Sequence, residues 1–185
     1  MPMTNVFTGA YGSLVLANED TPEGGDAKAV IDVYEIQTVG RVTEVRVAVQ
    51  TNLEEFHEVG RRHPTSLHPG NIHISGEVGR AYINGALLFL LLGRGAAPTQ
   101  VAEPYVQPVF NMLVKVNDPA VPGSTAGLEL KGVKFENWAY TMPEDDFVLE
   151  KLVFKALTIS VVDQESPAGG GAAAALAPSF PEATA

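Results

Sequence analysis

Apolar residues recur at every second position in several segments of this chain, and this pattern constrains the fold most. The alternation runs through 45–49 and 110–116, and less regularly through 72–78, with mostly polar residues between the apolar ones. Successive side chains of a β-strand point to opposite faces, so a period of two is typical of a strand with one buried face. Each of these segments is therefore predicted to be a strand with one face in water.

Four further segments extend the strand pattern. Residues 11–17 and 28–36 are predicted strands. Apolar residues occupy both parities of 149–162, which predicts a central strand buried on two faces. Along 128–140 the parity of the apolar residues flips and returns, which indicates a β-bulge, and Gly132 is a suitable residue for it.

One segment breaks the alternation. Residues 84–93 (NGALLFLLLG) begin with Asn84, continue through helix-forming leucines and end at Gly93. An Asn cap and a terminal Gly are typical of helix ends. The segment is apolar nearly all round, so the sequence predicts a short buried helix of about two turns that closes the open end of a sheet structure or contacts a second subunit.

Together these elements predict a mainly β fold, an antiparallel β-sandwich or open barrel with one short buried helix. The chain has 185 residues, which suits one domain with an appendage. We assign the β domain to 1–162, with an exposed acidic loop inserted at 18–27 and a long loop at 51–70. Residues 163–185 are rich in Ala, Gly and Pro and carry acids, which predicts a disordered tail.

Composition excludes several classes of function. The chain has no cysteine, so it has no disulfide and no thiolate site. Its net charge is −10, and the only paired arginines are Arg61 and Arg62, so no basic patch for tight nucleic-acid binding is visible. The longest apolar stretch, 86–92, is too short to cross a membrane, and no secretory signal is visible, so we expect action in the cytoplasm and no membrane partner.

Each group of residues that could form a catalytic or metal site also has an ordinary surface role as its alternative. Four histidines lie within one segment, at His57, His63, His68 and His73. Their spacings of 6, 5 and 5 residues differ from the spacing of two on a strand, or of three or four on a helix, that brings metal ligands together, so a cupin-like metal site is disfavoured. The acids of 143–146 could hold a divalent cation or form a solvated turn. No Walker, dinucleotide-binding, metalloprotease or nucleophile-elbow motif occurs. We expect no catalytic residue, no cofactor and no bound metal.

The C-terminal half carries a family resemblance. The segments 130–138 (LKGVKFENW), 142–147 (MPEDDF) and 154–159 (FKALTI) resemble bacteriophage tail tube proteins of contractile or long-tailed phages. The resemblance is continuous over 125–162 and looser over 11–95, where it includes 11–16 (YGSLVL) and the start of the leucine-rich helix. It covers residues that shape a fold and none that carry catalysis.

The resemblance implies a structural subunit of a phage virion. Such proteins form homohexameric rings whose strands join in one ring-shaped barrel, and the rings stack into a hollow conduit for genome ejection. The implied partners are other copies of the chain, a tape-measure protein, a baseplate or initiator, a tail terminator and, where one exists, a sheath. DNA would pass without specific binding, and assembly would take place in the host cytoplasm.

Two related roles share this expectation. The alternatives are an inner-tube subunit of a type VI secretion system or extracellular injection machine, and a phage decoration protein with a β-sandwich that never polymerises. Exposed character suggests the contact residues. Candidates for ring stacking are Glu54, Glu55, Arg61 and Arg62, and candidates for lining the bore are Glu44, Arg46, Gln50, Asn111, Lys115 and Asn117.

Overall fold

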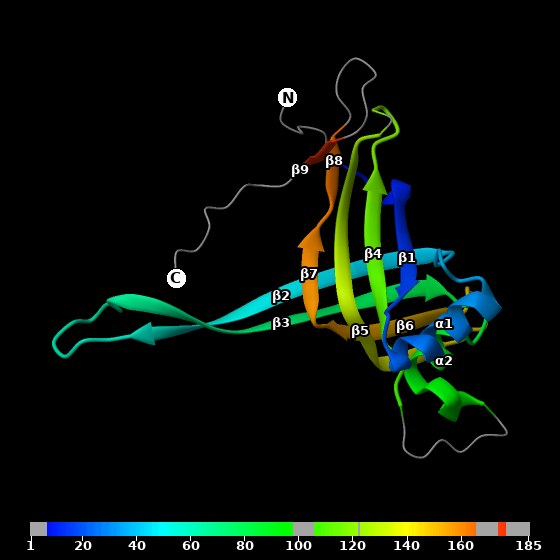
Figure 1. The fold of residues 1–185 in the computed structure, drawn as a ribbon, viewed down its shortest axis with the longest axis horizontal. Coiled ribbons are helices and arrows are strands. Elements are labelled where there is room, and N and C mark those ends of the chain that lie inside the picture. The colour runs from blue at the N-terminus through cyan, green and yellow to red at the C-terminus, as the bar shows by residue number, and fades with distance from the viewer. Residues whose placement is uncertain (1–6, 98–105, 122, 166–173, 177–185) are drawn as a thin grey trace.

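The computed structural model describes residues 7–97, 106–121, 123–165 and 174–176. Figure 1 shows a curled antiparallel sheet with two α-helices at one side and a long hairpin extending from the other. The helical elements are η1 (Gly9–Tyr11), α1 (Pro22–Tyr34), α2 (Ala86–Leu92) and η2 (Gly93–Ala96). The strands are β1 (Gly12–Asn18), β2 (Val42–Phe56), β3 (Ser66–Ala81), β4 (Phe110–Asn117), β5 (Thr125–Thr141), β6 (Leu149–Ala156), β7 (Thr158–Val161), β8 (Asp163–Glu165) and β9 (Ala174–Leu176).

The sheet folds over on itself, and strand β5 belongs to both resulting layers. The strand order is β1-β4-β5-β6-β3-β2, with β7 and β8 also paired to β5. Residues 125–133 of β5 pair with β4, whereas residues 134–141 pair with β6. We call β1, β4, β7 and the first half of β5 the first layer, and β2, β3, β6 and the second half of β5 the second layer. Strands of one layer run across those of the other (Figure 1), so the predicted mainly β, antiparallel fold class is confirmed as a half-barrel.

Strand β5 changes layer at the predicted bulge. Its pairing with β4 shifts register between Phe110 and Met112, opposite Lys131 and Gly132. Gly132 has a φ of 63°, in the left-handed region that glycine adopts without strain. The Asn111 side chain holds this conformation, because its Oδ1 accepts a hydrogen bond of 3.1 Å from the Gly132 amide.

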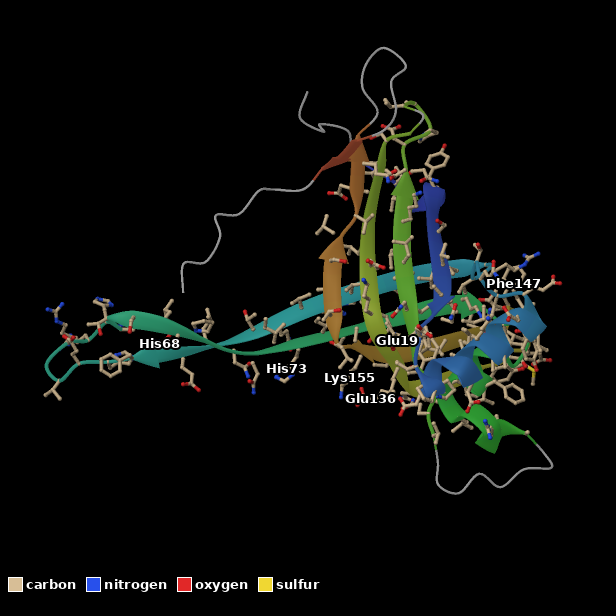
Figure 2. All side chains as sticks on the ribbon, viewed as in Figure 1. Glu19, His68, His73, Glu136, Phe147 and Lys155 are labelled. Carbon is tan, nitrogen blue, oxygen red and sulfur yellow. The ribbon has the colours of Figure 1, made fainter. Side chains whose placement is uncertain are left out.

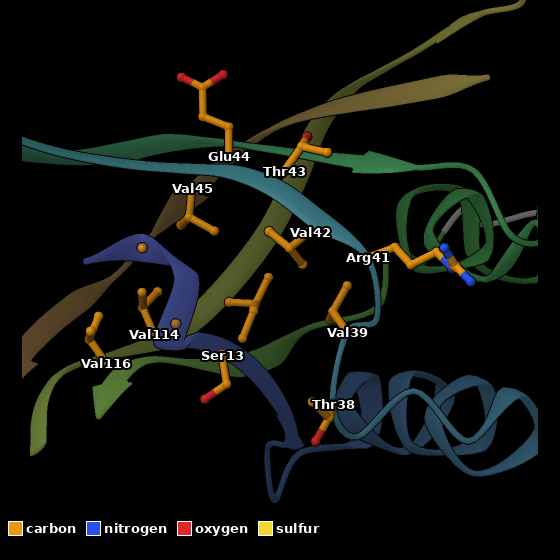
Figure 3. Close-up of a pocket in the computed structure, with 13 residues that line it drawn as sticks. Ser13, Thr38, Val39, Arg41, Val42, Thr43, Glu44, Val45, Val114 and Val116 are labelled. Atoms are coloured by element: carbon orange, nitrogen blue, oxygen red, sulfur yellow. The ribbon is translucent and has the colours of Figure 1, made fainter. Parts of the chain in front are cut away.

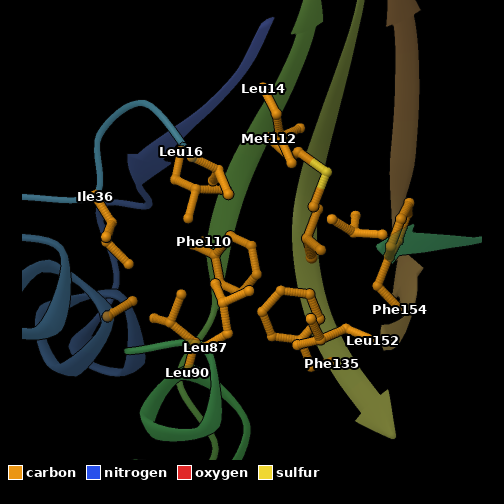
Figure 4. Close-up of a cluster of buried hydrophobic side chains, with 14 of the residues drawn as sticks. Leu14, Leu16, Ile36, Leu87, Leu90, Phe110, Met112, Phe135, Leu152 and Phe154 are labelled. Atoms are coloured by element: carbon orange, nitrogen blue, oxygen red, sulfur yellow. The ribbon is translucent and has the colours of Figure 1, made fainter. Parts of the chain in front are cut away.

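The hydrophobic core lies between the two layers (Figure 4). Leu14, Leu16, Phe110, Met112 and Leu130 enter it from the first layer. Ile74, Val78, Phe135, Leu152 and Phe154 enter it from the second layer. Phe110 and Phe135 face each other across it with ring centroids 5.0 Å apart. Because each of these strands alternates, the residues between the core positions point away from the core on both sides of the molecule.

The predicted buried helix is α2. Ala86, Leu87 and Leu90 are buried in the same core, and the Ala86 amide donates to Oδ1 of Asn84 at 3.3 Å. Tyr34 of α1 packs on Phe89 of α2 with centroids 5.9 Å apart. The helix therefore covers the core within its own chain.

Helix α1 corrects two expectations. Residues 28–36 were predicted as a strand and 18–27 as an acidic loop, yet α1 spans Pro22–Tyr34. Oγ1 of Thr21 accepts a hydrogen bond of 3.0 Å from the Gly24 amide, and Pro22 occupies the first turn, so the helix start is well capped. Ala27 and Ile31 then bury one side of the helix against the core, which overrides the β-branched composition of 30–33.

Two other segments differ from expectation in their extent. The predicted loop at 51–70 is mostly a hairpin, because β2 continues to Phe56 and β3 begins at Ser66. The single strand predicted at 149–162 is interrupted at Leu157 and continues as β7 along the other half of β5. In the tail predicted to be disordered, β8 and β9 pair with each other, and the remaining residues lie outside the described part of the chain.

Candidate functional site

The second layer presents a polar face on the side away from the core. On β2 this face carries Glu44, Arg46, Ala48 and Gln50. On the neighbouring strands it carries His73, Ser75, Glu77, Lys151 and Lys155. Arg46 pairs with Glu77 in the ladder, and Gln50 pairs with His73. The β2 residues proposed for a bore therefore do lie together on one continuous surface.

Charges on the polar face are arranged as neighbouring pairs of opposite sign. The Lys151 ammonium lies 2.6 Å from Glu77, and Lys155 lies 2.6 Å from Glu136. The hydrogen bond from Lys151, together with the charge of Lys151, holds the pKa of Glu77 below its usual value. The same hydrogen bond and the negative charge of Glu77 raise the pKa of Lys151. Lys134 pairs with Glu23 of α1 at 3.1 Å. The lysines on this face thus carry acidic partners, and the surface has no run of unpaired cations along its strands.

The candidates on β4 lie on the opposite side of the molecule. Asn111, Lys115 and Asn117 alternate with core residues of the first layer, so they point away from the core in the direction opposite to the polar face. Asn111 is already engaged with the Gly132 amide. A single bore can be lined by the β2 set or by the β4 set, but not by both.

Beyond the last residue paired to β6, strands β2 and β3 continue as a two-stranded arm, residues 51–72. Figure 2 shows this arm extending far from the rest of the molecule, with His73 at its base and His68 farther out. The four stacking candidates gather at its outer end. Glu54 and Glu55 lie on β2, paired with His68 and Leu67, and Arg61 and Arg62 lie in the turn that follows. Arg61 forms an exposed ion pair of 3.3 Å with Glu58.

An apolar strip, which the sequence pattern does not reveal, begins at Val49 beside the base of the arm and continues along the arm. On β2, Val49 and Leu53 share the parity of the core-facing Val45 and Val47. On β3, Ile72 and Leu67 pair with β2 residues of that same parity and so face the same way. All four strip residues are exposed, with Leu53 and Leu67 each at 57%. The side of the sheet that faces the core therefore continues along the arm with nothing covering it in the described chain.

A buried ionic network anchors the other end of the second layer. Arg80 and Glu150 are both 1% exposed, and the Arg80 guanidinium donates to Oε1 of Glu150. Oε2 of Glu150 accepts from the Trp138 indole N–H at 2.8 Å. Arg80 also donates to the carbonyl of Asn84 at 3.3 Å. The network connects β3, β5 and β6 to the start of α2, and every buried polar side-chain atom among the described residues has a hydrogen-bond partner.

The histidines and the 143–146 acids do not form a metal site in the described structure. No group of three or more His, Asp or Glu side chains close enough to hold a metal ion occurs there. His57 contacts Glu55 at 3.2 Å and His68 contacts Ser66 at 3.0 Å, both on the exposed arm. Among the described helices, none combines the length and apolar character needed to cross a membrane.

The fold is similar to solved structures of tube-forming assemblies. A chain of the sheath–tube complex of the PVC extracellular contractile injection system, in its extended state, aligns with a TM-score of 0.59 and 6% identity over 87% of this chain and 94% of that chain. A chain of the cap that terminates the tube of the anti-feeding prophage aligns with a TM-score of 0.56 and 8% identity over 88% of this chain and 99% of that chain.

The SPP1 tail tube gives a TM-score of 0.53 and 11% identity over 84% of this chain and 78% of that chain. No protein-family model and no curated protein sequence matches the chain. At these identities the comparisons establish the fold, and the resemblance to tail tube proteins noted in the sequence is confirmed at that level.

Proposed function

We propose that the chain is a structural subunit of a phage tail tube, assembling into six-fold rings that stack into a hollow conduit for DNA. The observation that carries this proposal is the second layer. It has four strands, and in the described chain neither β2 nor residues 134–141 of β5 pairs with another strand on its outer side. Two free edges on one sheet allow head-to-tail joining, and closure of a ring removes edges that otherwise promote aggregation.

The dimensions are suitable for a conduit. Six subunits with four strands each give about 24 strands, and with about 4.8 Å between strands and a tilt near 45° the backbone diameter is about 50 Å. Side chains reduce the bore to roughly 40 Å. This opening admits a nucleic-acid duplex and a coiled tape-measure protein.

The polar face is the part of the surface best suited to line that bore. It carries Glu44, Arg46 and Gln50 from the sequence-based set, whereas Asn111, Lys115 and Asn117 would face outward. Tight DNA binding requires cations free to release counterions from phosphates. The lysines of the polar face are held by Glu77, Glu136 and Glu23 instead, which favours passage without specific binding.

The arm is the proposed stacking element. It extends along the strand direction, and its end carries Glu54, Glu55, Arg61 and Arg62. Its exposed apolar strip requires another surface to become buried, and a subunit of the adjoining ring supplies one. The ends of such a tube would contact an initiating baseplate and a terminator, and its outside would contact a sheath where one exists.

A second candidate is the inner tube of an extracellular injection machine. The match to the sheath–tube complex favours it. Ring and tube formation is common to both candidates. Capsid and terminase genes beside the coding sequence would select the phage tail, and their replacement by effector and injection-machine genes would select the second candidate.

Electron microscopy of the purified chain beside a sizing column tests the proposal. Six-fold rings or hollow tubes are expected, and a protein that stays monomeric with an intact initiator complex would support the decoration-protein alternative instead. The double variant Arg61→Glu, Arg62→Glu should fold normally and block tube growth, because it reverses the charge at the end of the arm. The matched control is Lys28→Glu, Lys131→Glu, which makes the same change in charge away from the arm. Equal tube lengths in both would reject stacking by the arm.

A further inference from the structure

A pocket of about 420 Å³ opens between the free edges of the two layers, where β1 of the first layer approaches the start of β2 (Figure 3). We call it the valine pocket, because its walls include Val39, Val42, Val45, Val114 and Val116. Arg41 lies at its rim, is exposed, and forms no ion pair within the described chain. The pocket thus combines this group of valines with the hydroxyls of Ser13, Thr38 and Thr43, and with Arg41 and Glu44 at its margin. The Glu44 side chain points away from the valines (Figure 3), which leaves Arg41 as the charged group available to an acidic partner.

The connection between β5 and β6, residues 142–148, has the complementary character. Met142 is 70% exposed and Phe147 is 78% exposed. Between them lie Glu144, Asp145 and Asp146, which are exposed and form no ion pair among the described residues. We call this segment the acidic tip. Met142 has the same parity as Tyr140, and the Tyr140 hydroxyl donates to the Met142 sulfur at 3.8 Å. Both side chains therefore lie on the core side of the sheet, which is the side on which the valine pocket opens.

We infer that the acidic tip of one subunit fills the valine pocket of its neighbour in the same ring, with Phe147 and Met142 against the valines and the acids beside Arg41. This inference rests on the proposed function, because it requires the free edge of β5 in one subunit to pair with the free edge of β2 in the next. Strand directions alternate across the second layer, so that pairing is antiparallel.

Register places the tip and the pocket at the same end of the layer. Thr141 pairs with Leu149, Leu149 pairs with Ala81, and the Ala81 amide donates to the Arg41 carbonyl. Figure 2 shows Phe147 at the end of the layer opposite to the arm. A neighbouring subunit that is shifted across the strands, with no shift along them, would therefore place its Thr141 at the level of Arg41, where β2 begins.

The stagger of a tilted barrel moves the tip farther over the pocket. At a tilt near 45°, four strands of about 4.8 Å require each subunit to slide roughly six residues along the strands. If the neighbour slides toward the arm, residues 134–141 of its β5 lie beside roughly residues 47–54 of β2, and all of them remain paired. If the neighbour slides away from the arm, the same residues of its β5 pass beyond Val42, where β2 begins, and no pairing remains. Only the first direction closes the ring, and it lays the tip beside residues 42–46, which include pocket-lining Val42 and Val45.

The absence of cysteine in the chain allows a direct test by site-specific cross-linking. The variant Thr43→Cys, Met142→Cys is assembled and treated with a short bis-maleimide reagent. Within one subunit these positions lie on strands three spacings apart, about 14 Å, which is beyond the reach of such a reagent. The expected result is a ladder of covalent oligomers ending at the hexamer, with no ladder from either single variant. The pair Thr43→Cys, Val59→Cys tests the rival occupant, which is the arm of the adjoining ring.

The outcomes separate this inference from the proposed function. If rings or tubes form but the Thr43→Cys, Met142→Cys variant does not cross-link, the inference is overturned and the proposed tube function is unaffected. This holds whether or not the Thr43→Cys, Val59→Cys variant cross-links. Failure of the unmodified chain to form rings or tubes with an initiator would overturn both. As a second readout, Phe147→Asp should lose ring formation, whereas Val33→Asp, which changes a similarly exposed residue on α1, should not.

Discussion

The two ends of the β2–β3 hairpin use similar residues in opposite surroundings. In the body of the molecule, Ile74 and Val78 are buried under the first layer, and Arg80 ends the strand in a buried ion pair with Glu150. In the arm, Leu53 and Leu67 lie on the continuation of the same side of the sheet, but no first layer covers them. The body thus buries its apolar side by itself, whereas the arm leaves its apolar side exposed in the described chain, and the proposed function covers it with a second subunit. Substitutions should therefore affect folding at one end and assembly at the other.

The largest effect on folding is expected at Glu150. Glu150→Ala leaves the buried Arg80 guanidinium and the Trp138 indole N–H without their acceptor. Loss of one partner from a buried pair should reduce the free energy of unfolding by about 3–5 kcal/mol, measured by denaturant titration. Glu55→Ala, which removes an exposed acid from the arm, is the control and should change it by less than about 0.5 kcal/mol. Similar losses in both variants would contradict the contrast between body and arm.

Gly76 provides an intermediate effect within the body. A Cβ at this position would lie 2.2 Å from the carbonyl oxygen of Arg46 and 2.4 Å from the ring of Phe154. Gly76→Ala should therefore reduce the free energy of unfolding by about 1–3 kcal/mol, because the core must shift to accept the methyl group. Gly25→Ala on α1, where no atom lies within 4 Å of the added Cβ, should instead stabilise the chain by about 0.4–1 kcal/mol. A neutral Gly76→Ala would show that the second layer is loosely packed.

The smallest effect on folding is expected from the arm strip. Leu53→Ser with Leu67→Ser changes residues that remain exposed in the single chain, so the free energy of unfolding should move by less than about 0.5 kcal/mol. Tube formation, followed by light scattering and electron microscopy, should fall sharply because the strip no longer becomes buried against a neighbour. Val33→Ser on α1 is the control and should assemble normally. If the double variant lost much of its free energy of unfolding and still formed normal tubes, the arm strip would serve folding and not assembly.

Local patterns were sufficient to predict much of the sheet. The alternation at Phe110–Asn117 matches β4, and the flip of parity along 128–140 located the bulge at Gly132. Helix α1 was missed because its β-branched residues and Gly24-Gly25 favour other conformations, while its stability comes from burial of Ala27 and Ile31 by distant strands. The hairpin was predicted as a loop at 51–70, because a proline is unfavourable inside a sheet, although Pro69 lies within β3. However, β6 pairs with β3 only from Ile74 onward. At Pro69 the strand therefore has a free side, where a missing N–H is tolerated.

The candidate site was predictable strand by strand, but not across the sheet. Periodicity correctly grouped Glu44, Arg46 and Gln50 on one face of β2, and Asn111, Lys115 and Asn117 on one face of β4. That these faces point in opposite directions depends on the curl of the sheet at β5, which no local pattern encodes. The valine pocket also has no sequence signal, because it combines residues from β1, β2, β4 and the connection after α1.

The passage of β5 through both layers has a mechanical consequence. Residues 125–133 belong to one layer and 134–141 to the other, so the two are joined by covalent backbone as well as by side-chain packing. If the second layer lines the bore of a tube, as proposed, tension on it would be transmitted to the first layer along a covalent peptide chain rather than only through packed side chains. The Gly132 bend, with Asn111 bound to its amide, would then be the joint through which that load passes.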